Sequence, residues 1–161
     1  RRALDLGGGH GEYALELARR GLRTTMQDRP EVVDLARRRG RLAAAGVELF
    51  AGDFFESIPP GPFDVVLCAG VVYTYGPGAN RQLFRRVRPV VAPAGALAVH
   101  TFLGGRHPLA AVFAVQMLAA RPEGDTHREE HYREWLAEAG YRSVEVVELE
   151  RPPEAVVLAF P

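Results

Sequence analysis

Short apolar runs alternate with amphipathic stretches along most of the chain, and this alternation predicts the secondary structure. The run FDVVLCAG, residues Phe63–Gly70, is apolar almost throughout, which is typical of a parallel strand covered on both faces. Six other runs have the length and composition of strands. The seven expected strands are Ala3–Leu6, Thr24–Gln27, Val47–Ala51, Phe63–Gly70, Gly95–Phe102, Ser143–Leu149 and Ala155–Phe160.

Five stretches between these strands have the apolar period of amphipathic helices, and several carry helix-end signals. Pro30 stands in the first turn of the second helix, and Pro89 should kink or end the third. The Thr-x-x-Glu spacing of Thr126 and Glu129 is that of a capping box, so the last helix should open there and stop at Gly140. The expected helices are Gly11–Arg20, Pro30–Ala44, Ala79–Val91, Leu109–Ala120 and Thr126–Ala139.

The order of these elements predicts the fold class. Repeated strand–helix units indicate a parallel sheet with helices on both faces and right-handed crossovers. Only the linker ERPPE separates the last two strands, so they should return antiparallel. We therefore expect an α/β fold: a Rossmann-like, doubly wound, mostly parallel sheet of seven strands with an antiparallel C-terminal hairpin. The 161 residues show no internal repeat and no linker, which indicates one domain over residues 1–161.

The amino-acid composition excludes several classes of binding partner. Twenty basic and twenty acidic residues cancel, so no basic excess indicates nucleic acid. No run of 18 apolar residues and no signal-peptide pattern is present, so we expect no membrane contact and a cytoplasmic location. The single cysteine, Cys68, excludes an internal disulfide framework and a multi-cysteine metal site, and we expect no metal.

The stretch LDLGGGHGEYALEL, Leu4–Leu17, carries the candidate ligand site. Its glycines follow the first expected strand, where open α/β sheets bind ligands, and they let the backbone turn tightly and approach a ligand. A dinucleotide fingerprint fails, because Glu12 stands at the sixth position from Gly7 and its carboxylate would repel pyrophosphate. A phosphate-binding P-loop fails too, because the chain contains no lysine.

What fits is Asp-x-Gly-x-Gly-x-Gly, formed by Asp5, Gly7, Gly9 and Gly11, which resembles the class I S-adenosylmethionine-dependent methyltransferases. S-adenosylmethionine is a sulfonium cation with an amino group, so it tolerates nearby carboxylates. Asp28, 21 positions after Gly7, is placed to accept hydrogen bonds from both ribose hydroxyls, and it can also cap the following helix. The resemblance implies that Asp53 and Phe54 lie beside the adenine. The expected cofactor-binding residues are Asp5, Gly7, Gly9, Gly11, Asp28, Asp53, Phe54, Cys68 and Ala69.

The likeness extends over nearly the whole chain. LDLGGGHG, QDRPEVVDLAR, GDFFESIP and GANRQLFRRVRPVVAPAGALAV are similar to segments of small-molecule O-methyltransferases that act on plant phenolics or tailor bacterial polyketides. This implies methyl transfer from S-adenosylmethionine to a hydroxyl of a small aromatic or polyketide-like acceptor. It also implies that residues 1–161 are the catalytic domain, with a missing N-terminal helical domain through which a homodimer could form. FAVQMLAARPEGDTHREEHYREWLAEAGY is similar to the part with the acceptor-lining helix, so Phe113 and Met117 are candidate substrate contacts, with plain core packing as the alternative.

The family's catalytic histidine is absent. Its place, nine residues after Asp64, is taken by Tyr73, and the place of an acidic residue near the end of the fifth strand is taken by His100 or Thr101. A neutral tyrosine, with a pKa near 10, is a poor general base at neutral pH. Tyr73 and His100 are therefore the catalytic candidates.

Three explanations stay open for this departure. Methyl transfer can rely on proximity and alignment alone. His100 can serve as the base, or it can be a strand-end histidine bonded to backbone. The protein can also keep the cofactor for other chemistry, or be a binding domain without catalysis. Of the remaining histidines, His107 should start a helix, while His127 and His131 should lie on the surface of the last helix.

Overall fold

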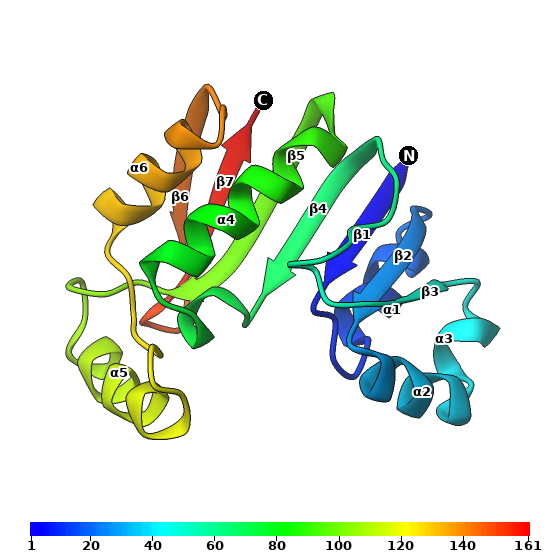
Figure 1. Cartoon of the computed structure of the whole chain (residues 1–161), viewed down its shortest axis with the longest axis horizontal. Coiled ribbons are helices and arrows are strands. Elements are labelled where there is room, and N and C mark those ends of the chain that lie inside the picture. The colour runs from blue at the N-terminus through cyan, green and yellow to red at the C-terminus, as the bar shows by residue number, and fades with distance from the viewer.

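The computed structural model describes residues 1–161 and contains one seven-stranded sheet in the order β3-β2-β1-β4-β5-β7-β6 (Figure 1). Strands β1 to β5 pair in parallel, and β7 pairs antiparallel with both β5 and β6. The expected Rossmann-like sheet with an antiparallel C-terminal hairpin is confirmed. The strands are β1 Arg2–Leu6, β2 Arg23–Asp28, β3 Glu48–Ala51, β4 Phe63–Ala69, β5 Val91–Phe102, β6 Ser143–Glu148 and β7 Glu154–Phe160.

Six α-helices and two short 3-10 turns connect the strands. None of the helices has both the length and the apolar character needed to cross a membrane. Figure 1 shows α5 at one end of the sheet, clear of the other helices. The helices are α1 Glu12–Arg19, α2 Pro30–Arg39, α3 Arg41–Ala44, α4 Pro77–Val87, α5 Pro108–Ala120 and α6 Glu129–Glu138; the 3-10 turns are η1 Val72–Thr74 and η2 Arg88–Val90.

The core lies in two layers on opposite faces of the sheet. On one face, α4 and α6 bury their largest apolar side chains, Phe84 and Trp135, against β1, β4, β5 and β7. On the other face, α1, α2 and α3 pack a smaller cluster around Met26 of β2. Because side chains alternate along a strand, Leu4 and Leu6 of β1 point to the larger cluster and Asp5 points to the face of Met26. Asp5 therefore lies under the α1 face.

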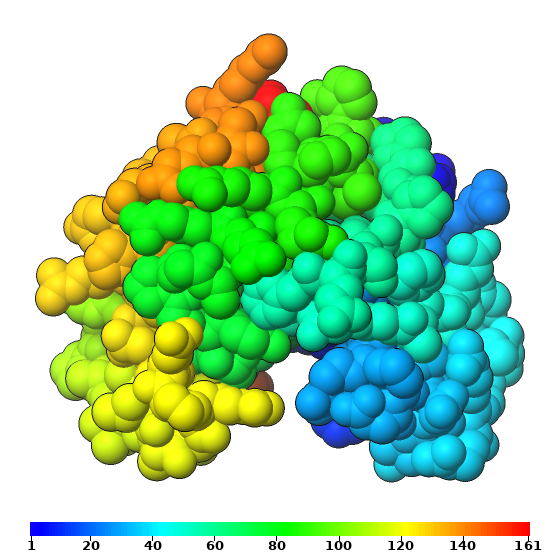
Figure 2. All heavy atoms as spheres, in the orientation of Figure 1, coloured from blue at the N-terminus to red at the C-terminus, as the bar shows by residue number.

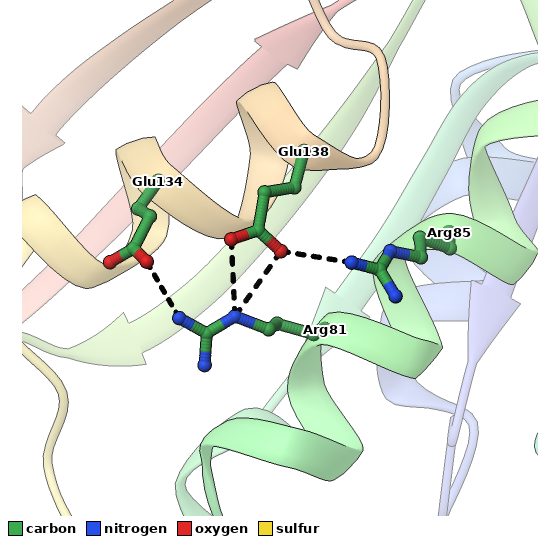
Figure 3. A network of polar contacts seen from close by, with 4 residues as sticks. All are labelled: Arg81, Arg85, Glu134 and Glu138. Carbon is green, nitrogen blue, oxygen red and sulfur yellow. Dashed lines mark hydrogen bonds and ion pairs between the residues drawn. The ribbon is translucent and has the colours of Figure 1, made fainter.

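A network of ion pairs joins α4 to α6 on the surface (Figure 3). Arg81 lies 2.7 Å from Glu134 and 3.2 Å from Glu138, and Arg85 lies 3.0 Å from Glu138. Exposed pairs of this kind contribute at most about 1 kcal/mol each. Burial of Trp135 beneath the network holds the two helices more firmly than the charges do.

Several expected element boundaries were wrong. The expected helix Pro30–Ala44 is broken at Gly40, which takes a left-handed conformation with φ of 69°. The expected helix Ala79–Val91 starts earlier, at Pro77, and ends at Val87. Pro89 does end it, within η2, as expected, and β5 then begins at Val91 rather than at Gly95.

The expected capping box at Thr126 was also wrong. Helix α6 begins at Glu129, and the Arg128 backbone N–H donates to His131 Nδ1 at 3.4 Å. The Thr126 hydroxyl instead donates to the Ala110 carbonyl at 3.3 Å, so the segment before α6 is hydrogen-bonded to α5. The segment before α6 also carries His127, which is 3% exposed and not on the surface as expected.

His127 joins three separate parts of the chain. Its Nε2 lies 3.0 Å from the Tyr75 carbonyl and 3.1 Å from Asn80 Nδ2, and Asn80 Nδ2 in turn donates to the carbonyls of Val72 and Tyr75. The loop after β4, the start of α4 and the segment before α6 thus meet at one buried imidazole. Burial lowers the pKa of His127 below its ordinary value.

Protonation of His127 should therefore destabilise the fold. The folded protein binds this proton less readily than the unfolded chain, so stability is lost as pH falls below about 6.5, by up to about 1.4 kcal/mol per pH unit. Urea unfolding measured at several pH values from 8 to 5 gives the free energies of unfolding. Wild type should be more stable than His127→Gln at pH 8, and this difference should shrink as the pH falls. The exposed His10→Gln variant should follow wild type. A constant difference between wild type and His127→Gln across this range would contradict the account.

Candidate functional site

The glycine loop between β1 and α1 is pinned to the next strand. The N–H groups of Gly7 and Gly8 both donate to the Gln27 carbonyl, at 2.9 and 3.2 Å. Gly7, Gly9 and Gly11 have φ values of 72°, 55° and 80°, which favour glycine over any residue with a side chain. The sequence pattern correctly located this turn.

Space around the loop is tight on one side and open on the other. A Cβ on Gly8 would lie 2.4 Å from Met26 Cγ and 2.7 Å from an Asp5 oxygen, so a side chain cannot fit there. A Cβ on Gly9 would meet nothing within 4 Å. The loop therefore presents open space above Gly9 while its underside packs on the core.

Asp5 lies under this loop with no partner for its charge. It is 1% exposed, and neither carboxylate oxygen has an ion-pair partner or a hydrogen bond of ordinary geometry. Burial raises the pKa of Asp5 to about 7; the nearby Ala14 backbone partly opposes the shift, and the negative charge of Asp28 adds to it. The site thus contains a carboxyl group that a nearby cation would stabilise in its ionised form.

The other two acidic residues at strand ends are held by backbone N–H groups. One oxygen of Asp28 accepts from the Gly9 N–H at 2.8 Å and the other from the Arg29 N–H at 2.8 Å. Asp53 accepts from the Phe55 N–H at 2.7 Å. Each oxygen keeps a lone pair for a further hydrogen bond, so both carboxylates can receive hydroxyl or amino donors from a ligand.

These acidic residues share one pocket, at the hollow that Figure 2 shows between α2 in blue and the yellow segment that follows α5. Gly7, Asp28, Asp53 and Phe54 were expected there. The residues of the loop after β4 and the arginine at the end of α5 were not expected. The local sequence does not indicate which distant loops lie next to the end of a given strand. The lining residues are Gly7, Asp28, Arg29, Asp53, Phe54, Gly70, Val71, Thr74, Tyr75 and Arg121.

The remaining expected cofactor residues, Gly9, Gly11, Cys68 and Ala69, are not among the residues that line the pocket. Gly9 and Gly11 belong to the loop, and Ala69 is half-buried at the end of β4. Cys68 points into the larger core cluster and is 1% exposed. Burial raises the pKa of this thiol to about 12. Only the backbone of Cys68 is therefore available to a ligand.

An aromatic cluster lies beside the pocket. Tyr73 of η1 packs against Phe113 of α5 and Phe102 of β5, with ring centroids 4.8 and 6.0 Å away. A Cβ on Gly70, which lines the pocket, would lie 2.9 Å from the Tyr73 hydroxyl. The structure thus brings the two expected residues Tyr73 and Phe113 together. Met117, one turn further along α5, is half-buried, and its backbone carbonyl and Cβ lie against Gly124.

Tyr73 keeps its proton at neutral pH. Burial raises the pKa of Tyr73 above its ordinary value, and Tyr13 and Glu154 add to the shift through their negative charge when ionised. The hydroxyl is therefore suited to donate a hydrogen bond or to line a pocket, and not to remove a proton.

His100 is not simply bonded to backbone, because its Nε2 lies 3.3 Å from a carboxylate oxygen of Glu154 at the start of β7. Sequence reasoning missed Glu154, since only the pairing of β7 with β5 brings it near. His107 starts α5 as expected, with Nδ1 accepting from the Leu109 N–H at 3.2 Å.

Glu12, whose charge was expected to exclude pyrophosphate, is exposed and pairs with Arg41 at 2.8 Å. The hydrogen bond from Arg41 lowers the pKa of Glu12, so the carboxylate stays ionised but has its own counterion. Its repulsion of an anion is therefore weaker than the sequence suggested.

Comparison with known proteins gives a consistent result. A family model described as an O-methyltransferase domain matches residues 1–142. The chain is 33% identical over 145 residues to the mitomycin biosynthesis 6-O-methyltransferase of Streptomyces lavendulae, covering 87% of this chain and 41% of that protein. It is 30% identical over 169 residues to the 3-hydroxy-5-methyl-1-naphthoate 3-O-methyltransferase of Streptomyces sahachiroi, covering 99% and 48%.

Solved structures of similar fold are also methyltransferases. The solved structure of human N-acetylserotonin methyltransferase in complex with SAM superimposes with a TM-score of 0.87 at 28% identity, covering 98% of this chain and 46% of that one. The chain spans about half the length of the curated relatives it matches.

The buried charge of Asp5 should reduce stability. Its folded-state pKa lies above the unfolded value of about 4, so stability is lost as pH rises from about 4 to about 7. Asp5→Asn should thus be more stable than wild type above pH 7, by up to about 4 kcal/mol, with the gain vanishing near pH 4. Denaturant unfolding at several pH values measures this, with the exposed Asp34→Asn as the control. A wild type that is more stable than Asp5→Asn at pH 8 would show that the carboxylate has a partner.

Proposed function

Because this chain belongs to the O-methyltransferase family, we propose that it transfers a methyl group from S-adenosylmethionine to a hydroxyl oxygen of a small aromatic or polyketide-like molecule. The observation that carries the proposal is the pocket in which the glycine loop, Asp28, Asp53 and Phe54 meet, beside the aromatic cluster of Tyr73 and Phe113. One half fits a cofactor with ribose and adenine, and the other fits a flat acceptor.

The residues of the pocket fit S-adenosylmethionine by charge and by shape. Asp5 is buried beneath the glycine loop and does not line the pocket itself, and a cation bound at the loop would favour its ionised form. Gly7, whose φ of 72° favours glycine, lines the pocket and lets a ligand approach the main chain closely. Asp28 has lone pairs for the ribose hydroxyls, and the ring of Phe54 lines the pocket for the adenine. When bound, S-adenosylmethionine supplies an electrophilic methyl group on a sulfonium.

The chain's own residues would orient the acceptor. Phe113 and Phe102 lie with their centroids 4.3 Å apart and offer an apolar wall for an aromatic ring. The Tyr73 hydroxyl, held next to Gly70, can donate a hydrogen bond to the acceptor oxygen. Alignment of this oxygen with the methyl group lowers the barrier by removing the need to bring the two together from solution.

The resemblance to the family also supports two wider proposals. A homodimer would form through an N-terminal helical domain of the kind the family carries, and the protein would act in the cytoplasm.

Asp28 should contribute directly to cofactor affinity. Asp28→Ala removes a charged acceptor and frees the Gly9 N–H, so binding of S-adenosylhomocysteine should weaken by about 1.5–3 kcal/mol. Titration calorimetry on folded protein measures the loss, and the exposed Asp34→Ala on α2 serves as the control. Equal affinities for Asp28→Ala and wild type would remove Asp28 from the site.

Tyr73 should assist binding of the acceptor without taking its proton. Tyr73→Phe should therefore lower the single-turnover rate less than tenfold, which corresponds to about 1 kcal/mol for one neutral hydrogen bond. The probe is a panel of phenols led by 3-hydroxy-1-naphthoate, because one relative is named for methylation of a hydroxynaphthoate.

Two other outcomes of the Tyr73 experiment are informative. A loss of about 100-fold in Tyr73→Phe, with cofactor binding intact, would make Tyr73 the base and contradict the assignment. A wild type that binds S-adenosylhomocysteine and methylates no phenol would favour the alternative in which the cofactor serves other chemistry or none.

A further inference from the structure

His100 and Glu154 form a half-buried pair on the α1 face of the sheet. His100 Nε2 lies 3.3 Å from Glu154 Oε2, and the two side chains are 19% and 31% exposed. Two tyrosines are titratable neighbours of this pair: Tyr13 of α1, with its ring centroid 6.3 Å from that of His100, and Tyr73, whose pKa is raised in part by Glu154. Glu154 lies beyond residue 142, where the match to the family model ends.

The strand register holds the pair in place. In the antiparallel pairing of β5 with β7, Phe102 is opposite Glu154 and His100 is opposite Val156. His100 and Glu154 are therefore diagonal neighbours on one face, within reach of long side chains. The Glu154 backbone is fixed as well, because its N–H donates to the Arg151 carbonyl and its own carbonyl accepts from the Leu149 N–H.

The pair defines which ring nitrogen is free. An ionised Glu154 can only accept a hydrogen bond, so it favours the imidazole tautomer with the proton on Nε2. Nδ1 then carries a lone pair. An imidazole with one nitrogen oriented by a carboxylate and the other free is the arrangement used for general-base catalysis.

The position of His100 connects it to both halves of the pocket. The Gly70 N–H, at the edge of the pocket, donates to the His100 carbonyl at 3.2 Å. Phe102, two residues along the same face of β5, packs against Tyr73 and Phe113. His100 therefore stands on the segment of β5 that connects the pocket edge at Gly70 with the aromatic cluster at Phe102.

We infer that His100 is the general base of the reaction and that Glu154 is the residue that positions it. The inference rests on the proposed function. His100 Nδ1 takes the proton as the acceptor O–H bond breaks, and the acceptor oxygen bonds to the methyl carbon as the carbon–sulfur bond breaks. The positive charge of the sulfonium passes to the imidazolium, which afterwards releases its proton to water. The products are a methyl ether and neutral S-adenosylhomocysteine.

The tautomer can be tested without any turnover. Nitrogen-15 NMR of the imidazole rings, assigned with His100→Gln, should show His100 at pH 8 with its proton on Nε2 and Nδ1 unprotonated. Glu154→Gln should remove this preference, and the exposed Glu145→Gln should leave it unchanged. A proton on Nδ1 in the wild type would overturn the inference.

Single-turnover rates on the same phenol panel, from pH 5 to pH 9, test the proton transfer. His100→Gln should lose about 100-fold or more in rate and the acid limb of the pH profile, while the acceptor KM changes less than about threefold. Glu154→Gln should lose about tenfold. His131→Gln, on the exposed side of α6, and Glu145→Gln should match wild type.

Calorimetry of S-adenosylhomocysteine binding distinguishes failure of the proposed methyl transfer from failure of His100 as its base. Wild-type rates in His100→Gln, with binding intact, would overturn the base and leave the proposed function standing. If wild type binds S-adenosylhomocysteine but methylates no phenol, both the proposed reaction and the base fail. Loss of binding in His100→Gln would also contradict the inference, because the residue would then serve the cofactor.

Discussion

The close approach of the glycine loop to β2 is the constraint on which the rest of the site depends. Gly7 and Gly8 share one carbonyl of β2, and a side chain on Gly8 would overlap Met26. This approach buries Asp5 under the loop and brings the Gly9 N–H onto Asp28. The direction of the loop, the ionisation of Asp5 and the position of Asp28 therefore follow from the absence of side chains at two adjacent residues.

The same constraint links stability to function. A buried, unpaired carboxyl group such as Asp5 opposes folding unless a cation compensates it, so an apo protein with this loop carries a cost that ligand binding can offset. The acceptor side is built differently. It consists of aromatic side chains from η1, β5 and α5, and it depends on the buried His127 node to hold the loop after β4.

The sequence predicts the elements and turns that depend on neighbouring residues, but not the contacts between residues that are far apart along the chain. Apolar periodicity located all seven strands, and the spacing of Asp5 with the glycines located the loop. Gly40 was assigned to a helix interior because the apolar period continues past it to Leu42, although the chain takes a left-handed conformation there. His127 and Glu154 were missed because their partners lie 47 to 54 residues away, in elements whose neighbours follow from sheet order. The insertion of β7 between β5 and β6 is the step that no local pattern reveals.

The central claim is that the loop holds S-adenosylmethionine and not a dinucleotide, and comparative thermal unfolding tests it most directly. Glu12 is paired with Arg41, so the carboxylates that would repel pyrophosphate are those lining the pocket, Asp28 and Asp53. S-adenosylhomocysteine at about 100 times its Kd should stabilise the protein by about 2.7 kcal/mol and raise the Tm by several degrees. NAD and NADP at the same concentration should leave the Tm unchanged. An equal rise with either dinucleotide would contradict the central claim.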